Sequence, residues 1–119
     1  IKKKFSIKDL EINSFDQDHG FSNSMGYRVN NIAYSTDVCN LDNNAFDNLY
    51  NLDLWIVDCL RLQPHKTHAH LDKTLSWVEK IKPKKTILTH MNNEVDYDEI
   101  SNLLPKNCYA GFDGLKIKV

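Results

Sequence analysis

The chain has 119 residues, of which 41% are apolar, and its formal net charge is −1. This length suits one domain with a packed core, and the apolar content excludes a disordered chain. The near balance of 15 basic and 16 acidic side chains gives no bulk signal for nucleic-acid binding. No stretch approaches the ~18 apolar residues of a membrane span, so no membrane partner is expected.

The cysteines and the first residues bear on where the protein works. Cys39, Cys59 and Cys108 include no CxxC pair, and their number is odd. We therefore expect reduced thiols and a cytoplasmic protein. The opening segment IKKKFSIKDLEI has no apolar core of a signal peptide. Because the chain has no initiator Met, we expect it to begin within a longer sequence.

Predicted strands dominate the first half of the chain. Alternating apolar residues over 5–12 predict a strand, and the polar segment 16–20 is expected to end it. The segment 24–36 predicts a hairpin that turns at Asn30-Asn31. The segment 43–50 predicts a short helix with an Asn cap.

Strands and helices alternate in the second half. An unbroken apolar run predicts a strand over 54–59 that is covered on both faces. Helical spacing predicts helices over 71–81 and 97–104, and further strands are expected over 85–89 and 115–119. This alternation predicts an α/β layer with its helices on one face of a sheet.

Imidazole and carboxylate groups follow several of the predicted strands. Such groups are the usual ligands of zinc or manganese, provided that several of them converge. Strand ends at one edge of a sheet can bring them together. The candidates are His19, Asp37, the loop histidines His65, His68 and His70, and His90.

Each of these residues also has a structural interpretation. His19 and Asp37 fit ordinary turns, and His90 fits a histidine satisfied in the core. His70 stands at the N-cap of the helix over 71–81, and His65 fits an exposed loop position. Composition alone leaves the metal site and these structural roles equally open.

Several strings, taken in order, carry a resemblance to a known family. They are DHG, SMGYRV, AYSTDV, LDLWIVDCLR, PHKTHAHL, IKPKKTILTHM, DYDEI and FDGLKIKV. The chain resembles the C-terminal half of metallo-β-lactamase-fold hydrolases, closest to the phosphoribosyl 1,2-cyclic phosphate phosphodiesterases. The resemblance implies one mixed sheet with helices on one face, which is half of an αββα sandwich. Residues 1–119 would form a single partial domain, and the family's His-x-His-x-Asp-His motif is not among them.

The resemblance also implies roles for individual residues. His19 matches the histidine that completes one metal site, Asp37 matches the aspartate that bridges two ions, and His90 matches the last histidine on the second ion. His68 matches the loop histidine that serves as general acid or contacts phosphate. The implied cofactors are two divalent ions, zinc or manganese, which activate a water molecule.

We therefore expect a metal-dependent phosphodiesterase acting on a small phosphodiester, cyclic ones included. The alternatives are another hydrolase of the superfamily, such as an RNA-processing nuclease or a thioesterase, and a non-catalytic binding module. Residues 1–119 alone should bind metal weakly or not at all and should be inactive. The sequence leaves open whether the chain forms a homodimer. We also expect an apolar sheet face opposite the helices, where a second layer would pack.

Overall fold

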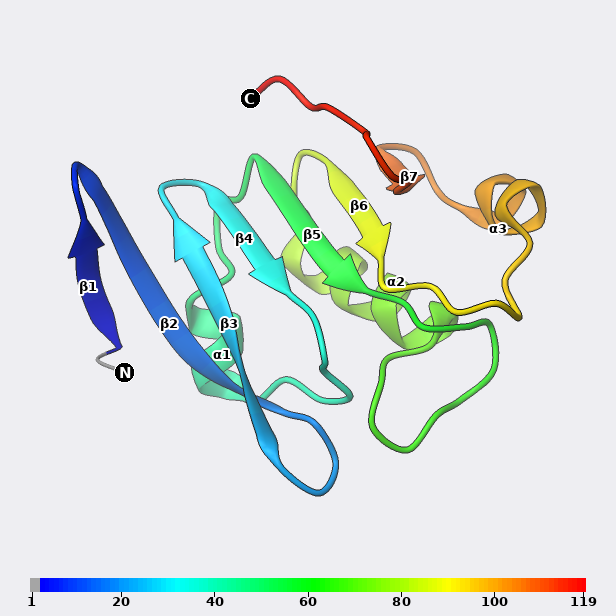
Figure 1. Cartoon of the computed structure of the whole chain (residues 1–119), viewed down its shortest axis with the longest axis horizontal. Coiled ribbons are helices and arrows are strands. Elements are labelled where there is room, and N and C mark those ends of the chain that lie inside the picture. The colour runs from blue at the N-terminus through cyan, green and yellow to red at the C-terminus, as the bar shows by residue number, and fades with distance from the viewer. Residues whose placement is uncertain (1–2) are drawn as a thin grey trace.

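The computed structural model describes residues 3–119, which form one mixed sheet with helices packed against it (Figure 1). The strands are β1 (Lys4–Ile7), β2 (Leu10–Asp18), β3 (Asn23–Val29), β4 (Ile32–Ser35), β5 (Leu54–Asp58), β6 (Thr86–Thr89) and β7 (Cys108–Ala110). The helices are α1 (Asn43–Asp47), α2 (Leu71–Ile81) and α3 (Tyr97–Leu103). None of the helices in this described part is long and apolar enough to cross a membrane.

The seven strands of the described region lie side by side in chain order. The pairs from β1 to β4 are antiparallel, whereas β4, β5, β6 and β7 pair in parallel. Parallel neighbours need a crossover, and α1, α2 and α3 occupy the three crossovers. In Figure 1, α1 and α2 lie behind the sheet and α3 lies beside β7. The predicted fold class, a mixed α+β sheet with helices on one face, is confirmed.

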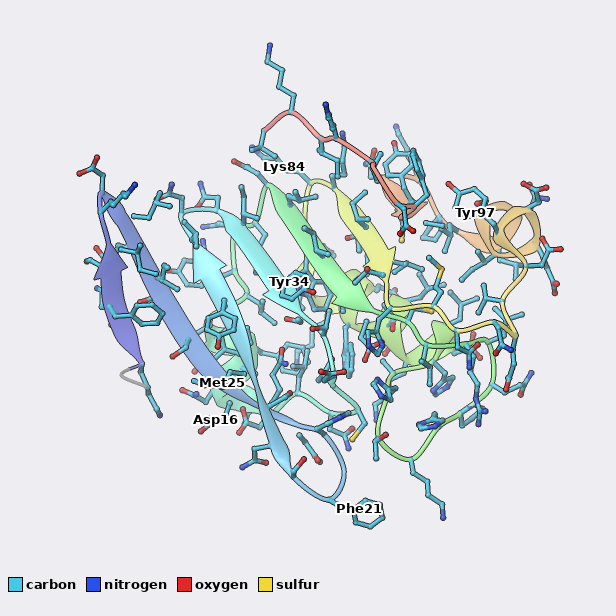
Figure 2. All side chains as sticks on the ribbon, viewed as in Figure 1. Asp16, Phe21, Met25, Tyr34, Lys84 and Tyr97 are labelled. Atoms are coloured by element: carbon cyan, nitrogen blue, oxygen red, sulfur yellow. The ribbon has the colours of Figure 1, made fainter. Side chains whose placement is uncertain are left out.

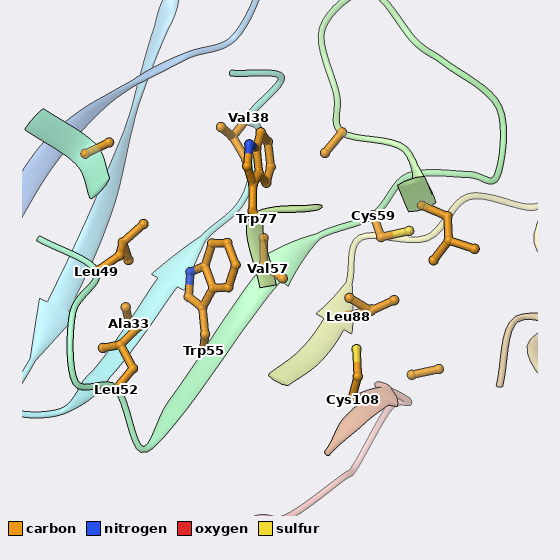
Figure 3. Packing of buried hydrophobic residues seen from close by; sticks show 14 of the residues in the cluster. Ala33, Val38, Leu49, Leu52, Trp55, Val57, Cys59, Trp77, Leu88 and Cys108 are labelled. Atoms are coloured by element: carbon orange, nitrogen blue, oxygen red, sulfur yellow. The ribbon is translucent and has the colours of Figure 1, made fainter. Parts of the chain in front are cut away.

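The side of the sheet that faces α2 forms the hydrophobic core. Trp55 and Val57 of β5 and Leu88 of β6 are all completely buried (Figure 3). The Trp55 ring lies 6.5 Å from the Trp77 ring of α2, measured between centroids. The Trp55 indole N–H also donates to the Ser35 hydroxyl at 3.1 Å, so its polar atom is satisfied inside the core.

The opposite side of the sheet, which we call the outer face, is only partly covered. Tyr34, Ile56, Ile87 and Tyr109 are directly paired across four adjacent strands. The tyrosines at the two ends of this row are 46% and 48% exposed, whereas Ile87 is only 6% exposed. Leu115 and Ile117 of the C-terminal segment line a groove together with Ile56 and Ile87. The outer face therefore carries apolar side chains that only this short segment partly shields.

Two strand predictions were wrong. The segment 5–12 is not one strand but parts of β1 and β2, joined by a turn in which Lys8 has a positive φ of 53°. The segment 115–119 is not a strand, although it alternates apolar and charged residues. It runs over the outer face, and the edge strand that was missed is Cys108–Ala110.

Two details at helix starts also differ from the predictions. The N-cap of α1 is Asp42, whose carboxylate accepts from the Ala45 N–H at 2.8 Å, and the helix ends at Asp47. His70 does occupy the N-cap position of α2, but its side chain makes no capping hydrogen bond. The predicted bounds of α3 hold to within one residue, and the helix is capped by the Asp96 carboxylate, which accepts from the Glu99 N–H at 3.1 Å.

Candidate metal centre

Four strands of the sheet end in titratable side chains at one edge. The antiparallel pairing of β2 with β3 and of β3 with β4 makes β2 run in the same direction as β4, β5 and β6. The C-terminal ends of these four strands therefore meet at one edge, which we call the strand-end edge. The residues there are His19 after β2, Asp37 after β4, Asp58 at the end of β5 and His90 after β6.

The structure brings the four residues predicted for the site together. His90 Nε2 lies 3.5 Å from Asp37 Oδ1, and His68 Nδ1 lies 4.0 Å from the same oxygen. The His68 ring stacks on the His90 ring at 4.9 Å and meets the His19 ring edge-on at 4.8 Å. One ligand atom from each of His19, Asp37 and His68 fits within 4.8 Å of the others.

The backbone is strained at two of these positions. The φ angle is 54° at Asp37 and 64° at His90, in the left-handed region that residues other than glycine rarely adopt. Each residue lies just beyond the end of a parallel strand, where the chain must turn. Strain of this kind persists when the surrounding structure imposes it, and it is common at functional sites. Here the two strained residues, Asp37 and His90, are the ones whose side chains approach each other at 3.5 Å.

His19 is held in one tautomer by the loop between β5 and α2. Its Nδ1 lies 2.7 Å from the carbonyl oxygen of Thr67. A carbonyl can only accept, so Nδ1 carries a proton, and in the neutral ring Nε2 is then the nitrogen with a lone pair for a metal. Gly20 permits this contact: its φ is 83°, and an added Cβ would lie 2.7 Å from Thr67 Cγ2. The turn and the loop are thus packed closely behind His19.

His68 is held by a buried carboxylate. Its Nδ1 lies 2.8 Å from Asp58 Oδ2, and the Asp58 side chain is completely buried. The same oxygen accepts from the Val38 N–H at 3.2 Å, and the Thr74 hydroxyl of α2 donates to the Asp58 carbonyl at 2.7 Å. Asp58 is thereby tied to the segment after Asp37 and to α2.

The loop that carries His68 is closed at its base. The Leu60 N–H donates to the Ala69 carbonyl at 2.9 Å, and the Ala69 N–H donates to the Val38 carbonyl at 2.7 Å. Arg61 and His70 also form a β-bridge between the two ends of the loop. His68 therefore precedes Ala69, which is anchored and fully buried, and this fixes the position of His68 relative to Asp37.

Asp58 was not among the residues predicted for the site. Burial raises the pKa of its carboxyl, while the hydrogen bond from His68 acts in the opposite direction. Its Oδ1 is buried and has no hydrogen-bond partner among the described residues, although His90 Nδ1 lies 3.6 Å away. The sequence feature that could have identified Asp58 is its place directly after the apolar run 54–57, with no turn residue beside it.

The donor set fits a divalent cation. Imidazole nitrogens and carboxylate oxygens are the ligands that zinc and manganese take in proteins. Three carboxylate or imidazole groups, Asp58, His68 and His90, form a second cluster within 4.8 Å, next to the cluster that contains Asp37. An unpaired buried carboxylate oxygen is costly unless positive charge lies near it. The unsatisfied Asp58 Oδ1 is therefore consistent with a cation at this edge.

The two other loop histidines lie outside both clusters. The exposed His65 ring meets the His68 ring at 5.4 Å, and its Nδ1 accepts from the Thr67 N–H at 3.2 Å. Its pKa is lowered by desolvation first and then by the positive charge of Arg61. His70 is half-buried at the start of α2. The structure thus separates His68 from its two neighbours in the loop.

Comparisons with known proteins agree with this arrangement. The family model of the Beta-lactamase superfamily domain matches residues 1–91. The crystal structure of a new diphosphatase from the PhnP family superposes with a TM-score of 0.96 at 30% identity, over 100% of this chain and 47% of that chain. The crystal structure of Zn²⁺-bound PqqB from Methylobacterium extorquens has a TM-score of 0.74 at 13% identity, over 100% of this chain and 54% of that one.

A curated protein also matches in sequence. An octanoyltransferase from Porphyromonas gingivalis is 23% identical over 114 residues, which are 94% of this chain and 23% of that protein. The chain thus spans about half the length of the diphosphatase and less than a quarter of the octanoyltransferase. At 13% identity, the likeness to PqqB concerns the fold alone.

Proposed function

The chain belongs to the beta-lactamase superfamily, and from this premise we propose that the protein is a metal-dependent hydrolase of phosphodiesters. The observation that carries the proposal is the convergence of His19, Asp37, His68 and His90 at the strand-end edge. The likeness to a diphosphatase at 30% identity supports a phosphoryl substrate. Small phosphodiesters fit better than long nucleic acids, because the net charge is −1 and gives no basic surface in bulk.

His19, Asp37 and His90 would be the metal ligands that this chain supplies. Two bound divalent ions would supply an activated water and would neutralise charge on the phosphoryl oxygens. Asp37 is half-exposed and its Oδ1 lies 3.5 Å from His90 Nε2, so the two side chains would hold an ion together. The Thr67 carbonyl accepts from Nδ1 of His19, which in the neutral ring leaves Nε2 as the nitrogen that would bind the ion.

His68 would act as the general acid. The Asp58 carboxylate accepts the Nδ1 proton of His68 and orients the ring, so that Nε2 would be the atom that donates a proton to the leaving alkoxide. The P–O bond to the leaving group breaks as this proton is transferred, and the water-derived oxygen remains on phosphorus. Because Asp58 is anchored by Val38 and Thr74, the imidazole is oriented before substrate binds.

The remaining ligands would come from a part of the protein beyond this sequence. Three ligands do not make up two metal sites, and this chain covers 47% of the related diphosphatase. In this proposal the added part packs on the outer face and completes an αββα sandwich. Residues 1–119 alone would then bind zinc or manganese weakly, which isothermal titration measures. Tight stoichiometric binding together with phosphodiesterase activity would show that this chain is sufficient.

The full-length protein provides the test, with metal content and bis(p-nitrophenyl) phosphate turnover measured on each variant. Asp37→Ala should remove bound metal and activity together. His68→Gln should retain the metal while kcat falls about 10²- to 10⁴-fold, because only proton transfer is lost. His70→Gln is the matched control: the residue lies in the same loop, makes no capping bond and should leave both measurements unchanged.

Three outcomes would contradict the proposal. Loss of metal from His68→Gln as complete as from Asp37→Ala would make His68 a ligand rather than a general acid. Hydrolysis of thioesters without any hydrolysis of phosphodiesters would assign the site to a different substrate class. A protein with full activity after Asp37→Ala would not use this metal centre at all.

A further inference from the structure

A groove lies beside the metal centre, between the β2–β3 turn and the histidine loop. Its lining residues are Phe21, Arg61, Pro64, His65, Lys66 and Thr67. Phe21, which is 91% exposed, stands at the tip of the turn (Figure 2). The Phe21 ring is therefore free on both faces and available to stack against a ligand that enters the groove.

The groove is structurally continuous with the metal centre. Thr67 lines the groove, and its carbonyl holds His19 at 2.7 Å. His65 lines the groove, and its ring lies 5.4 Å from the His68 ring. The close packing of Gly20 on Lys66 and Thr67 keeps the tip of the turn beside the loop. A substrate whose phosphorus sits at the centre can therefore extend directly into the groove.

The chemistry of the groove indicates what it would hold. Phe21, Pro64 and His65 offer flat or apolar surfaces to a ring. Of the two cations, Arg61 is already engaged, since it donates to the Gln63 and Pro64 carbonyls and lies 3.6 Å from Glu94. Lys66 forms no ion pair within residues 3–119 and is exposed, so its charge is available to a ligand.

We infer that this groove is a subsite for an aromatic base linked to the phosphate, so that the substrate is a nucleoside phosphodiester. The inference rests on the proposed phosphodiesterase function and narrows its substrate class. The base stacks on Phe21, and Lys66 attracts the negative charge of the phosphate. Stacking of a base on an aromatic side chain tolerates any base, so the groove selects for a nucleoside without selecting its sequence.

Two substrates with the same leaving group test the inference on the full-length protein with its metal bound. They are thymidine 5′-(p-nitrophenyl) phosphate and methyl p-nitrophenyl phosphate. The wild type should prefer the thymidine ester in kcat/KM. Phe21→Ala should lower kcat/KM for the thymidine ester about tenfold, mainly through KM, and leave the methyl ester unchanged. Phe21→Tyr should preserve the preference, because the ring remains.

Binding of products gives a second measurement that does not depend on turnover. Titration calorimetry should show that the wild type binds thymidine 5′-monophosphate more tightly than methyl phosphate, and that Phe21→Ala removes the difference. Tyr50→Ala is the matched control, since Tyr50 is also an exposed aromatic residue, at 61%, but lies between α1 and the start of β5, away from the strand-end edge. It should retain the wild-type preference.

The outcomes separate this inference from the proposed function. If both esters are hydrolysed and Phe21→Ala leaves their ratio unchanged, the subsite is overturned while the phosphodiesterase proposal stands. Equal losses on both esters would also overturn it, because Phe21 would then act on the shared group or on the fold. If neither ester is hydrolysed and neither product binds, both proposals fail.

Discussion

The two faces of the sheet differ sharply in how completely the chain covers them. On the face toward α2, Phe15, Trp55 and Leu88 are at most 1% exposed. On the outer face, Tyr34 and Tyr109 remain close to half exposed. The strands are the same, so the difference comes from what packs on them: two amphipathic helices on one side, and a short C-terminal segment on the other.

This difference locates the stability of the chain and the position of the site. The helix face buries the large side chains, so most of the free energy of unfolding should come from there. The candidate metal centre lies at the strand-end edge, and its buried support comes from the helix side, through Asp58 and Thr74. The site is therefore supported from the helix face, whereas the outer face is covered only in part by the C-terminal segment.

The largest effect should come from a core residue of the helix face. Trp55→Ala should lower the free energy of unfolding by about 3–5 kcal/mol, because it leaves a cavity beside Trp77 and removes the partner of the Ser35 hydroxyl. Ile56→Ala, one residue along the same strand but on the outer face, is the matched control and should cost about 1 kcal/mol. Urea denaturation of both variants measures the difference. Equal losses would show that the outer face is as well packed as the helix face.

A buried cation on the helix face should matter somewhat less. Arg28 is 7% exposed and donates to the carbonyls of Asn30, Asn48 and Tyr50, at 2.5–2.9 Å. Arg28→Met would leave these carbonyls without a donor, and we expect a loss of about 1–3 kcal/mol in urea denaturation.

Arg61, whose side chain is 28% exposed, makes a similar pair of bonds to loop carbonyls and provides the comparison. Arg61→Met should cost less than 1 kcal/mol, since water can replace its donors. An Arg28→Met variant as stable as the wild type would mean that the clamp between the β3–β4 hairpin and the segment after α1 contributes nothing to stability.

The two faces also explain which predictions from sequence succeeded. Helix α2 was predicted with its observed bounds, because its apolar stripe reflects packing on the sheet and Pro83 lies just beyond its end. The segment 115–119 alternates like a strand, yet pairing is a property of available neighbours, and β7 (Cys108–Ala110) already occupies the edge. A three-residue strand such as β7 carries too little pattern to be recognised.

The convergence of the candidate ligands at one edge was predicted for a related reason, whereas their roles follow from the family resemblance and stay predictions. His19, Asp37 and His90 follow strands that share a direction, so finding the strands was enough to place these residues at one edge. Asp58 was missed because its role depends on complete burial and on a hydrogen bond to His68. Both arise from the way the histidine loop folds back, which the local sequence does not determine. The groove at Phe21 likewise depends on the contact between a turn and a loop 48 residues apart, as measured from His19 to Thr67.

The smallest effect concerns the thiols on the helix side. Burial raises the pKa of Cys59 to about 12 and that of Cys108 to about 11, from an ordinary value of 9.0. At pH 8 both thiols should therefore resist iodoacetamide until the chain unfolds. A thiol introduced by Tyr34→Cys on the outer face should react at once, which sharpens the contrast between the faces. Rapid alkylation of Cys59 in the native protein would show that the helix face opens.

The same pKa shifts determine how stability depends on pH. The folded thiols hold their protons more tightly than the unfolded ones, so their contribution to the free energy of unfolding is complete below pH 9. It is lost as the pH rises above 9, because thiolates then form only in the unfolded chain. Other groups titrate in this range, so the measurement is a difference: Cys59→Ala/Cys108→Ala should show a shallower decline in urea denaturation between pH 8 and 10 than the wild type. Parallel curves would mean that these thiols ionise equally in both states, and the helix face would then be less dry than the burial of Trp55 and Leu88 indicates.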